Sequence, residues 1–175
     1  MSKSYKEVMN DIDTFIFDVD GVLTDGLVHI QPDGQLLRSM NIKDGFAMKA
    51  APQSGYRVCI ISGGYNEGVK IRLQNLGIYD IYLKTPDKVE TFKEYCDIYG
   101  VHPERVLYMG DDLPDFHVMQ RVGLPCCPQD ASPEIKRISH YVSHKMGGQG
   151  AVRDVIEQVM KTQEKWEKYY NGKLD

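Results

Sequence analysis

Two features are missing from this sequence: a long apolar run and a long basic run. A helix that crosses a bilayer needs about 20 mostly apolar residues, and no stretch approaches that length. The net charge is −4 without clustered Lys or Arg, which disfavours nucleic acid or an anionic membrane as a partner. The N-terminal segment also lacks the apolar core of a signal peptide, so we expect neither membrane insertion nor secretion.

Cysteine is scarce, and its spacing fits neither a disulfide scaffold nor a zinc site. The four cysteines include no C-x-x-C pair; they are Cys59, Cys96, Cys126 and Cys127. The five histidines are equally scattered and show no grouping typical of metal ligands. Reduced thiols fit a cytoplasmic protein, so we expect a cytoplasmic location. Neither spacing nor chemistry gives the adjacent pair Cys126–Cys127 a function.

What the sequence does contain is a regular alternation of short apolar runs and helical segments. Such alternation predicts βαβ units, a parallel sheet and right-handed crossovers. The expected strands cover residues 12–17, 56–61, 78–83, 105–109, 123–127 and 141–142. The expected helices include residues 46–53, 66–76 and 151–166, with a solvated tail to residue 175. We therefore expect one α/β domain over residues 1–175, with a Rossmann-like parallel sheet flanked by helices.

A small β-hairpin is expected directly after the first strand, over about residues 26–40. Two extended runs flank Pro32-Asp33-Gly34, which suits the turn of a hairpin. Both arms carry apolar side chains, and a two-stranded ribbon of this kind is not stable alone. We therefore expect another element or another subunit to cover the hairpin, which favours a homo-oligomer.

The first strand ends in two carboxylates, Asp18 and Asp20, followed by Gly21. In an open parallel sheet, ligands bind at the carboxyl ends of the strands. Two close carboxylates repel each other unless a cation or a shared proton relieves them, and oxygen ligands suit Mg²⁺. Asp-x-Asp-Gly is also ordinary turn chemistry. This pattern alone therefore does not separate a metal site from a turn.

Polar groups also follow the next strands of the expected sheet. Ser62 and Gly63 end the second strand, and Lys88 opens a helix. Three acids follow the fourth strand: Asp111, Asp112 and Asp115. Taken singly, each group has a structural explanation: a βα turn, a solvated lysine, or acids stabilised by a helix dipole. Because neighbouring parallel strands lie about 4.8 Å apart, the groups can meet in one pocket, and their joint occurrence favours a functional site.

This inventory suits phosphoryl transfer. A divalent cation and a lysine neutralise the negative charge that develops on a phosphoryl group. The Ser62 hydroxyl and the N–H groups of Gly63 and Gly64, expected at a helix N-terminus, can hold phosphate oxygens. One Asp can attack phosphorus and form an aspartyl-phosphate. The Asp two residues further along can protonate the leaving alcohol and then accept a proton from water.

These motifs, in this order, resemble those of the haloacid dehalogenase superfamily of phosphotransferases. Asp18-Val-Asp20-Gly-Val-Leu-Thr is similar to its first motif, Ser62 to its second, Lys88 to its third and Gly110-Asp111-Asp112-Leu-Pro-Asp115 to its fourth. The resemblance implies Asp18 as nucleophile and Asp20 as general acid and base. It also implies Mg²⁺ held by the Asp18 carboxylate, the Asp20 carbonyl oxygen and Asp111. Ser62 and Lys88 would contact the phosphoryl group, and Asp112 and Asp115 would be supporting acids.

Within that superfamily the chain resembles the capless family of 3-deoxy-D-manno-octulosonate 8-phosphate phosphatases. The resemblance rests on the lack of an inserted cap domain, the early hairpin and Gly147-Gly-Gln-Gly-Ala-Val-Arg153. It implies hydrolysis of a sugar-acid phosphate for lipopolysaccharide synthesis. It also implies a homotetramer whose hairpins help to cover neighbouring active sites. Arg72, ten residues after Ser62, and Asp44 match positions that the resemblance assigns to substrate binding.

Two departures from the family pattern bear on the substrate. Gly64 stands where the family commonly has Arg, and Pro114 stands where Asn is frequent. A nonulosonate 9-phosphate of the sialic-acid type therefore stays open as the substrate. A receiver-like phospho-Asp signalling domain and a non-catalytic scaffold are the alternatives from other classes. A receiver domain has its additional acidic residues before the phosphorylated aspartate and lacks an acid two residues after it, so the Asp18-x-Asp20 pattern disfavours a receiver. The intact set of acidic residues disfavours a non-catalytic scaffold.

Overall fold

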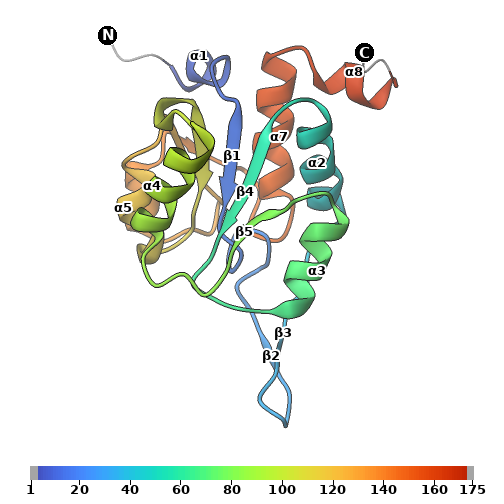
Figure 1. Ribbon diagram of the computed structural model, residues 1–175, viewed down its shortest axis with the longest axis vertical. Coiled ribbons are helices and arrows are strands. Elements are labelled where there is room, and N and C mark those ends of the chain that lie inside the picture. Colours follow the sequence, from blue (N-terminus) through green and yellow to red (C-terminus); the bar gives the residue numbers. More distant parts are fainter. Residues whose placement is uncertain (1–3, 173–175) are drawn as a thin grey trace.

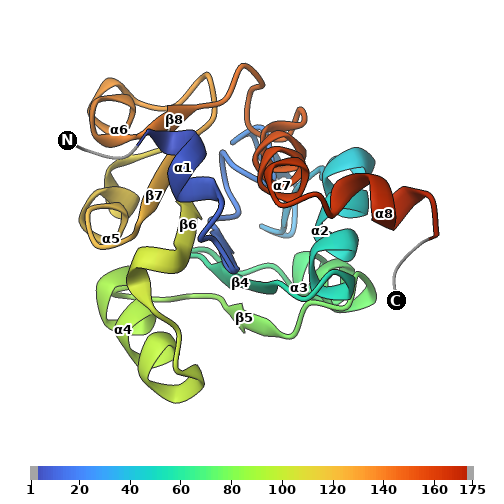
Figure 2. The ribbon, with the colours of Figure 1, turned by 90° about the horizontal axis from the view of Figure 1, so that it is seen from above.

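Six strands form one sheet in the computed structural model, which describes residues 4–172 (Figures 1 and 2). The strand order is β5-β4-β1-β6-β7-β8, and every neighbouring pair is parallel. The strands are β1 (Thr14–Phe17), β4 (Arg57–Ile61), β5 (Asp80–Tyr82), β6 (Val106–Met109), β7 (Leu124–Cys127) and β8 (Tyr141–Val142). The predicted parallel α/β sheet is confirmed, and no cap domain is present in the described residues.

Helices cover both faces of the sheet, so β1 is buried on both sides (Figure 1). Phe15 and Phe17 pack into one core, whereas Ile16 points to the opposite face and packs into a second core. The first core contains residues of α1 (Tyr5–Met9), α2 (Ile42–Gln53), α3 (Glu67–Asn75) and α7 (Ala151–Thr162). The second contains residues of α4 (Lys88–Tyr99), α5 (Phe116–Met119) and α6 (Pro133–Ile138). Two 3-10 turns, Pro103–Arg105 and Leu113–Asp115, flank β6.

The predicted hairpin is present, and its strands are short. β2 (His29–Ile30) pairs antiparallel with β3 (Leu36–Leu37), and Gly34 in the connecting turn has a φ of 85°. The ribbon projects away from the sheet (Figure 1). Ile30 is 75% exposed and Leu37 is 45% exposed. The hairpin therefore presents apolar side chains outside both cores.

Helix α2 begins earlier than predicted, at Ile42 rather than at residue 46. The Asn41 side chain accepts hydrogen bonds from the N–H groups of Lys43 and Asp44, which caps the helix at that point.

None of the helices in residues 4–172 combines the length and the apolar character that a bilayer crossing requires.

The C-terminal helix ends earlier than predicted, at Thr162 rather than near Trp166. Glu164 adopts a left-handed φ of 59°, which turns the chain before α8 (Trp166–Tyr170). Trp166 is 5% exposed and packs edge-on to Phe46. The expected tail is solvated at residues 167, 168 and 170–172, which are exposed, but it begins as a short helix instead of an irregular segment; residues 173–175 lie outside the described residues.

Candidate active site

The loops that follow β1, β4 and β6 meet at one edge of the sheet, because these strands are parallel neighbours. Together with the start of α4, they line a hollow of about 320 Å³. Asp18 and Asp20, the Ser62–Gly64 turn, Lys88, Asp111 and Asp112 all belong to this lining. The structure thus brings together most of the residues that the sequence singled out.

Asp18 is buried directly after β1 and has two partners. Its Oδ1 accepts the N–H of Val19 at 2.7 Å, and its Oδ2 lies 2.9 Å from the Nζ of Lys88. Burial and the nearby Asp115 carboxylate raise the pKa of Asp18 to about 7, although Lys88 acts in the opposite direction. A charged Asp18 therefore depends on positive charge close to it.

Lys88 joins the first and fourth motifs. Its Nζ donates to Asp115 Oδ1 at 2.7 Å as well as contacting Asp18. Burial lowers the pKa of Lys88, but the charges of the two carboxylates outweigh burial and raise it overall. The side chain is buried between two acids, so the explanation of Lys88 as a solvated helix residue is wrong.

Asp115 is fully buried and holds Lys88 in place. Its Oδ1 also accepts the hydroxyl of Tyr108 at 2.9 Å, and its Oδ2 accepts the N–H of Asp111 at 3.2 Å. Asp115 is therefore not a solvated first-turn acid. The sequence did not single out Tyr108, because an aromatic residue within an apolar strand is typical of a core position.

The acids of the hollow form a group that can hold a metal ion. Carboxylate oxygens of Asp18, Asp111 and Asp115 all lie within 4.8 Å of one another. Burial, followed by the charges of Asp18 and Asp115, raises the pKa of Asp111 to about 7. Lys88 supplies one positive charge against three carboxylates. Asp115 is occupied by its hydrogen bonds, whereas Asp18 and Asp111 line the hollow, which makes these two the candidate carboxylate ligands.

Gly21 allows the first loop to approach Asp111. A Cβ at position 21 would lie 1.9 Å from Asp111 Oδ2, and Gly21 has a φ of 82°. The Asp111 carboxylate therefore lies against the backbone that follows the Asp20 carbonyl. The carboxylate oxygens of Asp18 and Asp111 are donors of the kind that a hard divalent cation prefers.

Ser62 lies at the end of β4 and is buried. Its hydroxyl oxygen accepts the N–H of Gly64 at 3.3 Å, and its carbonyl accepts the N–H of Thr85 at 3.0 Å. Helix α3 begins only at Glu67, after the N-cap Asn66. The Gly63 and Gly64 amides therefore belong to a turn before the helix and not to its first turn, which corrects the sequence-based expectation.

Asp20 is held by a residue that the sequence did not single out. Arg38, which follows β3 of the hairpin, donates from Nε to Asp20 Oδ1 at 2.6 Å and from Nη2 to Oδ2 at 3.1 Å. The only signal for Arg38 in the sequence is a lone cation among the apolar residues of the second hairpin arm.

Asp44 and Arg72 do not line the hollow that holds Asp18. Asp44 lies in the first turn of α2, and its Oδ1 accepts the N–H of Arg153 in the first turn of α7 at 2.8 Å, which caps α7. Burial raises the pKa of Asp44 to about 6. Arg72 lines a neighbouring hollow of about 390 Å³, in which Arg38 also takes part. The structure therefore separates both residues from the catalytic candidates.

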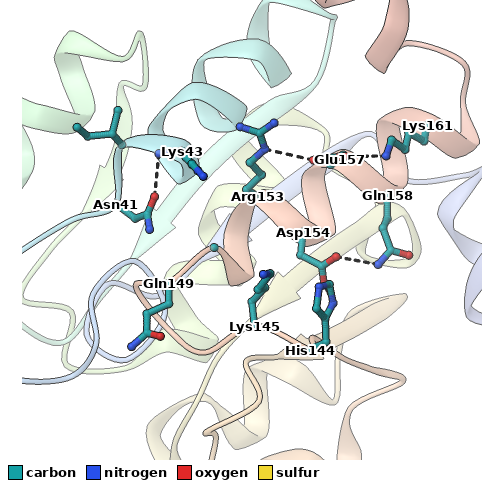
Figure 3. Close-up of a pocket in the computed structure, with 12 residues that line it drawn as sticks. Asn41, Lys43, His144, Lys145, Gln149, Arg153, Asp154, Glu157, Gln158 and Lys161 are labelled. Carbon is teal, nitrogen blue, oxygen red and sulfur yellow. Dashed lines mark hydrogen bonds and ion pairs between the residues drawn. The ribbon is translucent and has the colours of Figure 1, made fainter.

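A larger hollow of about 930 Å³ lies between the start of α2, helix α7 and the loop that precedes α7 (Figure 3). Several of its charged side chains are paired with one another. Glu157 contacts Arg153 at 3.2 Å and Lys161 at 2.6 Å, and Asp154 accepts a hydrogen bond from Gln158 at 2.9 Å. The clustered acids and the buried lysine lie instead in the smaller hollow. Chemistry rather than size therefore identifies the candidate site.

Comparisons with known proteins identify the family of this chain. Residues 63–156 match the haloacid dehalogenase-like hydrolase family. The 3-deoxy-D-manno-octulosonate 8-phosphate phosphatase of Salmonella typhi is 38% identical over 165 residues, which cover 94% of this chain and 84% of that protein.

Solved structures show the same fold. The phosphatase of that name from Yersinia pestis has a TM-score of 0.91 and 35% identity, covering 95% of this chain and 90% of that one. The Moraxella catarrhalis phosphatase, in complex with a magnesium ion, a phosphate ion and KDO, has a TM-score of 0.92 and 29% identity, covering 96% and 97%. The chain therefore belongs to the haloacid dehalogenase-like hydrolases and, within them, to the family of the 3-deoxy-D-manno-octulosonate 8-phosphate phosphatases.

Proposed function

We propose that this protein is a Mg²⁺-dependent phosphatase that releases phosphate from 3-deoxy-D-manno-octulosonate 8-phosphate in lipopolysaccharide precursor synthesis. The observation that carries the proposal is the buried contact of Lys88 with Asp18 and Asp115, beside Asp20 and Asp111. Relatives at 37–38% identity bear the name of this phosphatase. The magnesium, phosphate and KDO in the Moraxella catarrhalis structure support the same substrate here.

Asp18 is the proposed nucleophile. One of its carboxylate oxygens forms a bond to phosphorus while the bond from phosphorus to the substrate oxygen breaks. Lys88 keeps Asp18 oriented, and its positive charge lowers the pKa that burial raises. Asp20 gives a proton to the departing sugar oxygen, so the alcohol leaves in its neutral form.

The second half of the reaction regenerates Asp18. Water attacks phosphorus, the bond to the Asp18 oxygen breaks, and Asp20 accepts a proton from the water. Asp18, Asp111 and the Asp20 carbonyl are the groups proposed to hold Mg²⁺, which when bound neutralises charge on the phosphoryl oxygens. Ser62, the Gly63 N–H and Lys88 are proposed to contact the same oxygens.

Asp44 and Arg72 have different prospects as substrate contacts. Arg72 shares its hollow with Arg38, so we propose it as a contact for a part of the sugar acid distant from phosphorus. The carboxylate of Asp44 is engaged at the start of α7, and a role in shaping the fold there suits it better than substrate binding.

We also propose a homo-oligomer, of four subunits on family grounds, in a cytoplasmic location. The exposed apolar side chains of the hairpin support a covering second copy of the chain. The four cysteines are buried and unpaired, which suits a reducing compartment. Light scattering on the purified protein measures the subunit number, and a monomer would contradict this part of the proposal.

A comparison of kcat/KM for two substrates tests the function. We expect 3-deoxy-D-manno-octulosonate 8-phosphate to be preferred over nonulosonate 9-phosphates. A clear preference for the nine-carbon substrates would replace the proposed substrate and leave the phosphatase chemistry intact. Phosphate release from neither class would contradict the chemistry itself.

A further inference from the structure

Arg38 donates hydrogen bonds to both carboxylate oxygens of Asp20. Its Nε–Oδ1 distance is 2.6 Å and its Nη2–Oδ2 distance is 3.1 Å. The remaining nitrogen, Nη1, donates to the Leu36 carbonyl at 3.1 Å. A planar guanidinium fork matches a carboxylate in one mutual orientation. The contact therefore fixes the direction of the Asp20 side chain.

Asp20 differs in this respect from the neighbouring acids. Asp18 is held by the Val19 N–H and by Lys88, and Asp115 has three partners of its own. Within residues 4–172, the side chain of Asp20 has no hydrogen-bond partner other than Arg38. Removing Arg38 would therefore leave the Asp20 carboxyl free to rotate.

The body of the protein anchors Arg38 through the base of the hairpin. Asn66, the N-cap of α3, donates from Nδ2 to the Leu36 carbonyl at 2.9 Å. The same carbonyl accepts from Arg38, so β3 and α3 are joined two residues before Arg38. The guanidinium thus lies on a fixed part of the hairpin rather than on its projecting tip.

Gly64 leaves the space that the pair occupies. A Cβ at position 64 would lie 3.1 Å from Asp20 Oδ2 and 3.6 Å from Arg38 Nη2. A larger side chain would crowd the two groups. The β4 turn therefore accommodates the Arg38–Asp20 pair at the wall of the catalytic hollow.

We propose that Arg38 is the positioning residue for Asp20 and holds its carboxyl where it delivers a proton to the leaving alcohol. This inference rests on the proposed function. In the step concerned, Asp20 carries its proton on Oδ2 and the shorter Nε–Oδ1 hydrogen bond keeps the side chain oriented. The Asp18 oxygen bonds to phosphorus, the bond from phosphorus to the alcohol oxygen breaks, and that oxygen takes the proton from Asp20 Oδ2. Arg38 makes and breaks no covalent bond.

The test compares two leaving groups in the Arg38→Met variant. The sugar alcohol leaves poorly without a proton, whereas p-nitrophenolate leaves without one. General acid catalysis raises the reaction rate about 10²–10⁴-fold, and a freely rotating Asp20 carboxyl would keep part of this rate increase. We therefore expect kcat/KM for the sugar phosphate to fall roughly 30-fold and kcat/KM for p-nitrophenyl phosphate to fall less than about 3-fold. Arg38→Lys, which keeps the charge but not the fork, should give a smaller loss with the same selectivity.

Two controls complete the design. Adding Arg38→Met to Asp20→Asn should cause no further loss on the sugar phosphate, because the acid is already absent. Arg105→Met is the matched control, because it removes another Arg–Asp contact, from Arg105 Nε to Asp13 Oδ2 at 3.0 Å. It should leave kcat/KM for both substrates unchanged.

Three results would overturn the inference. They are equal losses on both leaving groups, unchanged sugar phosphate turnover, and a loss confined to sugar phosphates that carry a carboxylate. The last would make Arg38 a substrate contact. Full turnover by Asp18→Asn would instead overturn the proposed function, so the two failures are distinguishable.

Discussion

Lys88 lies between Asp18 and Asp115, and both carboxylates act on the pKa of Lys88. Burial lowers the pKa of Lys88, but the two carboxylates outweigh burial and keep it a cation. The cation in turn opposes the burial that raises the pKa of Asp18 to about 7. Without Lys88, the two buried carboxylates would face each other with no positive side chain between them, and the pKa of Asp18 would rise further.

Lys88→Met should therefore abolish most of the activity. Loss of one preorganised group that stabilises developing charge costs about 10²–10³-fold in kcat, and phosphate release under saturating Mg²⁺ measures it. Lys93→Met, an exposed lysine on the same helix, is the matched control and should retain wild-type kcat. A Lys88→Met variant that keeps its kcat would remove Lys88 from the phosphoryl site.

Gly21→Ala should lower kcat more than an alanine substitution at another glycine with a left-handed φ. The new Cβ would overlap Asp111 Oδ2, and a displacement of about 1 Å in a site can cost 10²-fold in rate. Gly34→Ala is the control, because Gly34 has a similar φ of 85° but a Cβ added there would meet no atom within 4 Å. It should lose only about 1–2 kcal/mol of stability and keep its activity. Equal kcat values for the two variants would show that Gly21 does not shape the site.

At the residue scale, sequence reasoning finds the groups that end strands and misses those that reach in from elsewhere. Asp18, Ser62 and Asp111 follow apolar strands, so their meeting at one edge could be predicted from the parallel order. Arg38 reaches Asp20 from the hairpin, and Tyr108 reaches Asp115 from within a strand. Both contacts depend on the direction of a side chain and on the course of the backbone in a loop, and the local sequence pattern defines neither.

At the scale of elements, the types and order were predictable, whereas several ends were not. The start of α2 depends on the Asn41 cap, a signal present in the sequence but outweighed by the later apolar run. The break after Thr162 is a local C-terminal cap with Glu164 in the left-handed conformation: the Lys165 N–H donates to the Met160 carbonyl at 2.7 Å and the Glu164 N–H donates to the Lys161 carbonyl at 3.0 Å. Glycine usually takes the left-handed position of such a cap, so Glu164 gives the sequence no signal for it.

Trp166→Ala should destabilise the protein without changing its chemistry. Truncating a buried aromatic side chain costs about 3–5 kcal/mol, and each kcal/mol lowers Tm by roughly 2–4 °C at this size. Tyr170→Ala, on the same helix but 57% exposed, should change stability by less than about 0.5 kcal/mol. Thermal unfolding measures both; similar Tm values for the two variants would mean that α8 contributes no packing energy.

At the scale of the whole molecule, the sheet order concentrates negative charge at one edge. β1 and β6 are neighbours, so the acids after them share one buried region although more than 90 residues separate them in the chain. In the folded protein without a metal ion, burial raises the pKa of Asp18 and of Asp111 to about 7. In the unfolded chain both groups return to about 4. The folded state thus binds more protons between these values, and its stability falls as pH rises through that window.

Mg²⁺ should counter this loss, and more strongly at higher pH. The ion needs deprotonated carboxylates, so its stabilising effect should be larger at about pH 8 than at about pH 5.5. Tm measured with Mg²⁺ and with a chelator at both pH values gives the comparison. Asp111→Asn should reduce the Mg²⁺-dependent gain, while Asp44→Asn, which alters another buried acid outside the hollow, should preserve it. A gain that is independent of pH would contradict the assignment of these carboxylates to the ion.

In the proposed reaction, the phosphoryl group passes through a covalent bond to Asp18. Asp20→Asn should slow the attack of water, so that a phosphoryl-enzyme accumulates during turnover of a good leaving group such as p-nitrophenyl phosphate. Acid quenching followed by peptide mass spectrometry measures it directly. We expect one phosphoryl group per chain, on Asp18 and absent from the Asp18→Asn variant. Phosphate release by Asp18→Asn at the wild-type rate, or a phosphoryl group on another residue, would contradict it.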